Sequence, residues 1–298
     1  MSLLQVSGIS KQQQGAFILK DISFTQQKFQ KIAIAGETGS GKSTLMKIVG
    51  GLAQADSGTV FFDGVRVKGS EEVLIPGFPG IAYLSQYFEL RNNYRVEEIL
   101  AYANKLVEED ANRIYEVCRV THLLKRRTEQ LSGGEKQRIA LARLLTTAPR
   151  MLLMDEPFSN LDMIHKSILK SVINDLVEEL EITCMLISHD AQDLLSWADE
   201  VMLMKDGVIV QQGTPQEVYY KPVNEYAAGL LGKYNIVQGR FVRPEDVVLG
   251  DKKGMKGIVN RVLFFGGYNE VEVLAAGQVI TVNTGTAKRT KGEEVYLS

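Results

Sequence analysis

The residues best suited to chemistry begin with a glycine-rich octet from Gly36 to Ser43, GETGSGKS, which fits the spacing G-x-x-x-x-G-K-[ST]. Its glycines allow a tight turn in which successive backbone N–H groups point at phosphate oxygens. Lys42 can neutralise phosphate charge, and the Ser43 hydroxyl can ligate Mg²⁺. The octet therefore predicts a site for nucleotide phosphates and Mg²⁺. The expected nucleotide contacts are Gly36, Glu37, Thr38, Gly39, Ser40, Gly41, Lys42, Ser43 and Thr44.

Two adjacent carboxylates, Asp155 and Glu156, follow the short apolar run from Met151 to Met154. Such a run is typical of a strand buried on both faces. Neighbouring residues on a strand point to opposite sides, so the two acids can divide roles at one site only if the strand ends there. Beside a phosphate loop, we expect Asp155 to hold Mg²⁺ and Glu156 to polarise the attacking water. An isolated Asp-Glu pair would be expected only to cap the strand in solvent.

A second glycine-rich helix start lies at residues 131–138, LSGGEKQR, where a hydroxyl and free N–H groups are open to an anion. This segment resembles the signature motif of ATP-binding cassette (ABC) ATPases. The resemblance implies a head-to-tail dimer, or pseudo-dimer, that holds two ATP molecules between its subunits. Ser132 and Gly134 would then contact the ATP of the opposite subunit, with Gly133 beside them.

Further segments follow in the order of that family. Gln86, in the run YLSQ, is similar to the glutamine that touches Mg²⁺ or the water and senses a helical insert. Residues 159–162, SNLD, are similar to the D-loop that crosses the dimer interface, and His189, in LISHD, resembles the switch histidine at the γ-phosphate. Alone, such a Gln or His would be structural more often than catalytic. The catalytic candidates are Lys42, Gln86, Glu156 and His189, and the expected metal ligands are Ser43, Gln86 and Asp155.

Base recognition is expected at Phe17, because the family usually stacks adenine on an aromatic residue and Phe17 is the one aromatic residue in residues 11–17. A strand pattern lies on both sides of it, so packing in the core is an equally good interpretation. Inward packing would predict that Phe17→Ala unfolds the sheet before it alters nucleotide preference.

An α/β framework must position these residues. Residues 3–10, 16–24 and 30–36 have strand composition, and 43–52 has helical spacing that ends in Gly-Gly. A hairpin is expected at Asp63-Gly64. Strands alternating with helices indicate βαβ units, here a P-loop NTPase cassette with a helical insert at about 87–130. Two apolar stripes are expected: Val96, Ile99, Leu100, Ala103 and Leu106 in the insert, then Ile164, Ile168, Val172, Leu176 and Leu180 in a long helix.

The length of 298 residues favours two domains. Short strands broken by glycine follow residue 226, so we place the cassette at 1–232 and a small all-β, barrel-like domain at 236–298. Residues 243–246, RPED, look like the start of the OB-type (TOBE-like) domain of binding-protein-dependent importers. In the sugar-importer branch of the family that appended region is roughly twice as long.

Composition restricts the partners. A formal net charge of −2 gives no footprint of a nucleic-acid binder, and the chain has no apolar run long enough to span a bilayer and no signal-peptide pattern. Cys118 and Cys184 have no CxxC spacing, so we expect packing residues in a reducing compartment. We therefore predict a cytoplasmic protein that reaches the cytoplasmic face of the membrane through a partner.

The predicted function is the ATP-hydrolysing subunit of an importer, in which ATP closes the dimer and hydrolysis reopens it. The resemblance implies a membrane permease whose coupling helix is received near residues 91–95, RNNYR, and indirectly an extracytoplasmic solute-binding protein. Two alternatives remain open. One is a soluble ABC ATPase acting on ribosomes or DNA, and the other is an exporter ATPase, which would typically lack the appended domain.

Overall fold

The computed structural model describes residues 2–86, 90, 92–159, 161–250, 252–285 and 289–298. The chain forms two compact units, Met1–Pro215 and Gln216–Ser298, and each is described by itself. Two residues of the sequence predictions, Arg91 and Asn160, lie outside the described residues. Within the described part of the chain, no helix is both long enough and apolar enough to cross a membrane.

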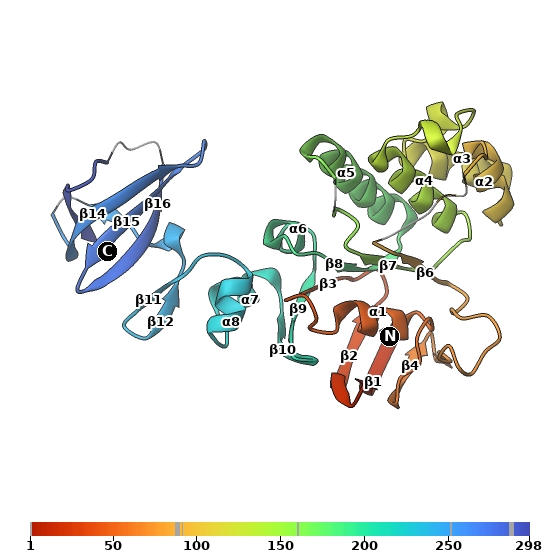
Figure 1. The fold of residues 1–298 in the computed structure, drawn as a ribbon, viewed down its shortest axis with the longest axis horizontal. Helices are drawn as coiled ribbons and strands as arrows, with labels where there is room; N and C mark the ends of the chain where they lie inside the picture. The colour runs from red at the N-terminus through yellow and green to blue at the C-terminus, as the bar shows by residue number, and fades with distance from the viewer. Residues whose placement is uncertain (1, 87–89, 91, 160, 251, 286–288) are drawn as a thin grey trace. The chain divides into compact units, whose positions relative to one another are not determined.

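A six-stranded sheet forms the centre of the first unit (Figure 1). Its strands run parallel except for the antiparallel pair at the β10 edge. Every residue of β7 is buried, as the short apolar run from Met151 to Met154 predicted, and every residue of β8 is buried too. In spatial order the strands are β10 (Val208–Gly213), β9 (Glu200–Lys205), β3 (Lys31–Gly36), β8 (Thr183–Ile187), β7 (Met151–Asp155) and β6 (Ile81–Leu84).

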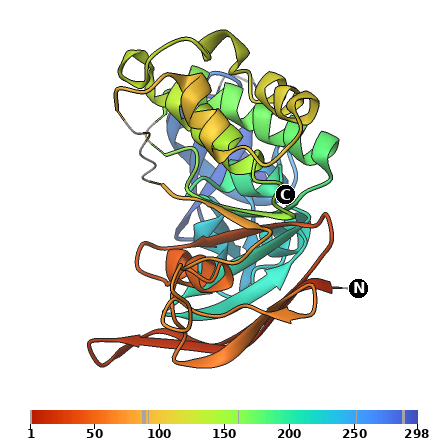
Figure 2. The same ribbon diagram turned by 90° about the vertical axis from the view of Figure 1, so that its right-hand side faces the viewer.

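A second, antiparallel sheet covers one face of the central sheet, with α1 (Lys42–Val49) packed between them. The apolar face of α1 enters the same core as both sheets, and the two views in Figures 1 and 2 show this layering. The predicted hairpin turns at Asp63-Gly64, and both residues have the positive φ that tight hairpins require. The strands are β1 (Ser2–Gln13), β2 (Ala16–Gln27), β4 (Ser57–Phe62) and β5 (Val65–Arg66).

Helices cover the other face and confirm the helical insert. Val96, Ile99 and Leu100 are buried as expected, but Ile164 is 72% exposed. The prediction for Ile164 is wrong because this residue lies in the exposed first turn of α5, whereas Val172 and Leu176 are buried and Ile168 and Leu180 pack against the same core. The elements are α2 (Val96–Ala103), α3 (Glu108–Val117), η1 (Thr121–Leu123), η2 (Thr128–Gln130), α4 (Gly133–Leu145), α5 (Met163–Leu180) and α6 (Ala191–Leu195). Cys118 and Cys184 are buried, unpaired packing residues.

The second unit is built on an antiparallel sheet around a valine-rich core. Its order is β13-β17-β14-β15-β16, and the pairings within the described residues leave β13 and β16 at the two ends. Closure into a barrel therefore stays a prediction. The elements are α7 (Pro215–Tyr220), α8 (Glu225–Leu230), β11 (Asn235–Val237), β12 (Arg240–Val242), η3 (Pro244–Asp246), β13 (Leu249–Gly250), β14 (Met255–Phe264), β15 (Asn269–Ala275), β16 (Gln278–Thr284) and β17 (Glu294–Leu297).

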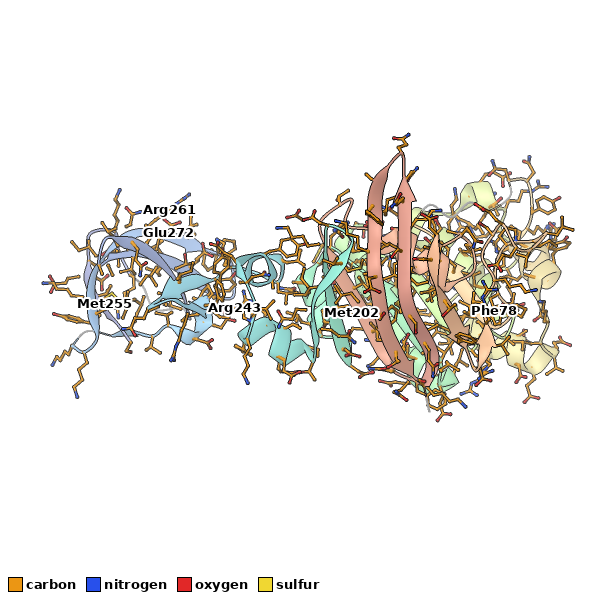
Figure 3. All side chains as sticks on the ribbon, turned by 90° about the horizontal axis from the view of Figure 1, so that it is seen from below. Phe78, Met202, Arg243, Met255, Arg261 and Glu272 are labelled. Atoms are coloured by element: carbon orange, nitrogen blue, oxygen red, sulfur yellow. The ribbon has the colours of Figure 1, made fainter. Side chains whose placement is uncertain are left out.

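Arg243 joins the helices of this unit to its strands. Its guanidinium, only 3% exposed and labelled in Figure 3, donates to the backbone carbonyls of Tyr219, Ala228, Gly232 and Lys233 at 2.8–3.2 Å. Burial lowers the pKa of Arg243, while nearby Tyr219 and Glu245 favour the charged form. These bonds hold residues 219–233 to Arg243 within the unit Gln216–Ser298.

Replacing Arg243 by Leu is expected to loosen α7 and α8, because several buried carbonyls lose their donor at about 1–3 kcal/mol for each group left unsatisfied. Hydrogen exchange of the amides in 216–235 measures the effect, and we expect their protection to fall by at least about tenfold. Arg240→Leu, which removes an exposed arginine on β12, is the matched control. Equal protection in the two variants would rule out this role.

Candidate active site

The phosphate loop connects β3 to α1, as its spacing predicted. Gly41, at the N-cap of α1, has φ +95°, a conformation that residues with a side chain rarely adopt. A Cβ at Gly41 would also lie 2.6 Å from the backbone oxygen of Ile18, and one at Gly36 would lie 2.4 Å from that of Met204. Glycine is therefore required at both positions for the loop to run close to the neighbouring strands and present its N–H groups at the helix N-terminus.

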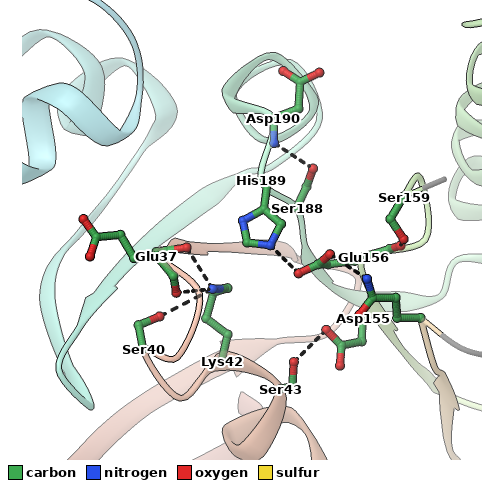
Figure 4. A network of polar contacts seen from close by, with 12 residues as sticks. Glu37, Ser40, Lys42, Ser43, Asp155, Glu156, Ser159, Ser188, His189 and Asp190 are labelled. Carbon is green, nitrogen blue, oxygen red and sulfur yellow. Dashed lines mark hydrogen bonds and ion pairs between the residues drawn. The ribbon is translucent and has the colours of Figure 1, made fainter. Parts of the chain in front are cut away.

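The Lys42 ammonium lies inside this loop (Figure 4). Its Nζ donates to the carbonyls of Gly36 and Glu37, both at 2.8 Å, and the side chain is almost fully buried. Burial lowers the pKa of Lys42, and the charges of Glu156 and Asp155 act in the opposite direction. The lysine is thus a cation held by neutral carbonyls, which phosphate oxygens can replace as stronger, charged acceptors.

Oxygen atoms suited to a hard cation lie close together between α1 and β7. Ser43 Oγ donates to Asp155 Oδ1 at 3.0 Å, and the Tyr83 hydroxyl donates to Asp155 Oδ2 at 2.7 Å. A hydroxyl beside a carboxylate suits Mg²⁺, which is usually bound by one or two protein oxygens together with substrate phosphates. Among the described residues, no group of three or more His, Cys, Asp or Glu side chains could hold a metal without such phosphates. Ser43 and Asp155 therefore fit a nucleotide-bound Mg²⁺.

Two of the catalytic candidates, Gln86 and His189, converge on the carboxylate of a third, Glu156. Glu156 Oε1 lies 2.5 Å from His189 Nε2 (Figure 4). Glu156 Oε2 accepts from Gln86 Nε2 at 3.1 Å. A carboxylate only accepts hydrogen bonds, so His189 Nε2 carries the proton of this contact. The two side chains fix the direction of the Glu156 carboxylate at the edge of the pocket that contains the phosphate loop.

Glu156 has a backbone conformation that strand patterns do not predict. Strand β7 ends at Asp155, and the next residue has φ +50°, in the left-handed region. A non-glycine residue held there costs roughly 1–3 kcal/mol. Bonds from Glu156 N to Ile187 O at 3.0 Å and from Ser159 Oγ to Glu156 O at 2.8 Å hold this conformation. Because β7 ends at Asp155, the adjacent side chains of Asp155 and Glu156 contact different partners, as expected from the sequence.

The pocket has a volume of about 360 Å³, and nine of the predicted site residues line it. Phe17 is not among its lining residues and is 50% exposed, so the interpretation of Phe17 as a core residue is wrong. It lies opposite Gln12, beside the turn at Gln14-Gly15 that joins β1 to β2. Its stacking on adenine stays a prediction. The lining residues are Ile18, which was not predicted, and Thr38, Gly39, Gly41, Lys42, Ser43, Thr44, Gln86, Glu156 and His189.

The signature residues Ser132, Gly133 and Gly134 do not line this pocket. Ser132 begins α4 with a capping box: its N–H donates to Glu135 Oε2 at 2.7 Å, and its Oγ accepts from Glu135 N at 3.3 Å. The helix start is well formed, and its residues lie outside the pocket that contains the phosphate loop of the same chain.

His165, which the sequence analysis did not select, links the signature residues to the D-loop. Its Nδ1 lies 2.6 Å from Asp162 Oδ2 and its Nε2 lies 3.5 Å from Ser132 Oγ. Hydrogen bonds from the backbone and side chain of His165 lower the pKa of Asp162. A Cβ at Gly134 would lie 2.5 Å from the His165 ring, so that glycine is required for this contact. The spacing of Asp162 and His165 on the first turn of α5 was the available signal.

A phosphate loop that faces a pair of strand-end carboxylates defines a P-loop nucleotide hydrolase. Residues 19–159 match the family described as ABC transporter. The sulfate/thiosulfate import ATP-binding protein CysA of Bacillus cereus is 34% identical over 253 residues, which cover 80% of this chain and 68% of that protein. The putrescine transport ATP-binding protein PotG of Escherichia coli is 33% identical over 261 residues, which cover 85% and 68%.

A solved structure agrees with these relatives. An ATP-binding cassette of an ABC transporter, in its ADP conformation, has a TM-score of 0.64 and 25% identity, and the match covers 74% of this chain and 96% of that one. The chain therefore belongs to the ATP-binding subunits of ABC transporters. The predictions of an importer-type transporter ATPase, of ATP binding and of the cassette fold are confirmed.

Proposed function

We propose that two copies of this chain bind two Mg-ATP molecules head to tail, and that dimer closure and hydrolysis drive solute import through a membrane permease. The observation that carries the proposal is the convergence of Gln86 and His189 on Glu156, at the edge of the pocket that contains Lys42. It supports a site in which a single polarised water attacks a phosphate held by the loop.

The side chains divide the chemistry of hydrolysis. Lys42 binds the β- and γ-phosphates, and the helix N-terminus adds its positive dipole end. Ser43 and Asp155 would hold Mg²⁺, which neutralises charge on the phosphate oxygens when bound. Glu156 orients and polarises the attacking water as general base. His189 and Gln86 keep the Glu156 carboxylate aimed at that water.

Two copies are proposed because the chain offers two anion sites on different surfaces. Ser132 and Gly134 do not line the pocket of their own subunit, which supports a role at the ATP of the partner. A symmetric pairing of identical chains satisfies both sites at once, because each phosphate loop receives the signature residues of the other copy. His165, which contacts Ser132, and Asp162, which contacts His165, would lie at this interface.

The permease is proposed to dock on the helical insert. A pocket of about 230 Å³ there is lined by Tyr94, Glu98, Ile99, Tyr102 and Arg143, and the Tyr102 side chain is 86% exposed. Aromatic residues beside one acidic and one basic group suit an amphipathic helix from a cytoplasmic loop of the partner. The residues that line this pocket follow Gln86 in sequence. The docked helix would therefore act on the segment after β6 that contains Gln86.

The proposal is tested by affinity capture of a tagged Glu156→Gln chain with Mg-ATP from gently solubilised native membranes. Recovery of a polytopic membrane protein is the expected result. Tyr102→Ala in the same background should lower that recovery by on the order of tenfold, as loss of an aromatic anchor does. Leu74→Ala, which trims a residue that is 98% exposed, serves as the control. Recovery of ribosomes or DNA-repair proteins without a membrane partner would contradict the proposal.

The transported solute is proposed to be selected by the permease and an extracytoplasmic binding protein. The two relatives carry names for sulfate/thiosulfate import and putrescine transport, an oxyanion and a diamine, on similar cassettes. The residues of the ATP site need not differ between transporters of such different solutes. We further propose that the second unit is the TOBE-like domain of this importer, that no nucleic acid is bound, and that the chain works at the cytoplasmic face of the membrane.

A further inference from the structure

Both oxygens of the Asp155 carboxylate have a hydroxyl donor. Ser43 Oγ donates to Oδ1 at 3.0 Å, and the Tyr83 hydroxyl donates to Oδ2 at 2.7 Å, which is the shorter of the two bonds. Asp155 is only 5% exposed, so water has little access to replace either donor. We propose that Tyr83 is a positioning residue for the metal site, which holds Asp155 Oδ2 so that Oδ1 faces Ser43 and Mg²⁺. The inference rests on the proposed function, because it takes Asp155 as a ligand of Mg²⁺.

The strand register explains why Tyr83 can reach this carboxylate. Strand β6 runs parallel to β7, with Tyr83 opposite Leu153. Side chains alternate along a strand, so Tyr83 and Leu153 share the face that packs on α1, and Asp155 lies two residues further along that same face. A tyrosine at this position extends along the sheet far enough to place its hydroxyl on the carboxylate.

The phenol is held as a donor. An ionised carboxylate only accepts hydrogen bonds, so the Tyr83 hydroxyl is the donor in its 2.7 Å contact with Asp155 Oδ2. The torsion that turns a carboxylate about its Cβ–Cγ bond has a broad minimum, so an unpaired Oδ2 would let Asp155 rotate away from the ligand geometry. Partners of this kind typically change metal affinity or activity by about 10–100-fold when they are removed.

Residues at the end of β6 and just after it contact both Asp155 and Glu156. Tyr83 donates to Asp155, and three residues later Gln86 donates to Glu156. The metal carboxylate and the water-polarising carboxylate are therefore both positioned by β6 and the residues that follow it. This arrangement distinguishes Tyr83 from a tyrosine that only fills space in the core.

The experiment compares ATP binding with and without the metal, in the Glu156→Gln background so that ATP stays intact. The readout is the ratio of the ATP Kd in EDTA to the Kd at saturating Mg²⁺, measured by calorimetry. Tyr83→Phe removes only the hydroxyl, and we expect it to lower this ratio by about tenfold or more while the Kd in EDTA stays unchanged. Tyr115→Phe, at a buried tyrosine of α3, is the matched control and should leave the ratio unchanged.

Three results would overturn the inference: an unchanged ratio in Tyr83→Phe, an equal fall in Tyr115→Phe, or a comparable loss of ATP affinity in EDTA, which would show a general disturbance of the loop. Asp155→Asn separates this failure from failure of the proposed function. If Asp155→Asn also leaves the ratio unchanged, the assignment of the metal to Asp155 is wrong. If only Asp155→Asn lowers it, the metal assignment holds and Tyr83 has no positioning role.

Discussion

Replacing Glu156 by Gln is expected to lower ATP turnover by at least about 10²-fold while ATP remains bound, because the amide keeps the size of the side chain but cannot act as the base. The two partners of the carboxylate make this a specific test. Gln86 and His189 both donate to Glu156, so the native geometry needs an acceptor at each oxygen. An amide offers one acceptor and one donor, and the water loses its polarising charge.

Steady-state ATPase assays and ATP titrations of the same protein separate the two effects. The expected pattern is a large fall in kcat with a Kd close to that of the parent chain. Glu178→Gln, which neutralises an exposed carboxylate on α5, is the control and should behave as the parent. Turnover at the parental rate in Glu156→Gln would remove this residue from the catalytic step.

Lys42→Ala is expected to weaken ATP binding by about 10–10²-fold, since a charge-assisted hydrogen bond contributes roughly 1.5–3 kcal/mol. The ammonium is buried inside the loop and has carbonyl acceptors from Gly36 and Glu37, so it is already desolvated before phosphate arrives. Binding then exchanges neutral acceptors for charged ones without a new cost of removing water from the lysine.

Titration with ATP at constant Mg²⁺ measures the loss of affinity. Lys47→Ala provides the control, because Lys47 lies one and a half turns further along α1 and is exposed. If the Lys42 and Lys47 variants bind ATP equally well, the phosphate assignment of the octet fails. Retained affinity with lost turnover would instead place Lys42 in the transition state alone.

The parts of the site that could be predicted are those whose backbone follows a regular pattern. The phosphate loop lies between a strand and a helix, and β7 ends where the two acids require it. Burial of β7 followed from a continuous apolar run, because a parallel sheet with both faces covered leaves no polar side. In each case local sequence and tertiary structure favour the same conformation.

The residues that escaped prediction depend on contacts between distant segments. The bond from Tyr83 to Asp155 requires the register of β6 against β7, which neither strand specifies alone. His165 approaches Ser132 only after α4 and α5 pack together. Phe17 was ambiguous because a short strand pattern does not say which face is covered, and the structure leaves it exposed.

The left-handed conformation of Glu156 has a consequence for how this site can change over time. Asparagine, aspartate and glycine tolerate a positive φ best, whereas β-branched residues adopt it only under strain. A chain that loses its base by point mutation would thus be expected to drift toward those tolerant residues rather than toward valine, isoleucine or threonine. Copies of the cassette that have become inactive should then remain folded at this turn, able to bind nucleotide and to pair with an active copy.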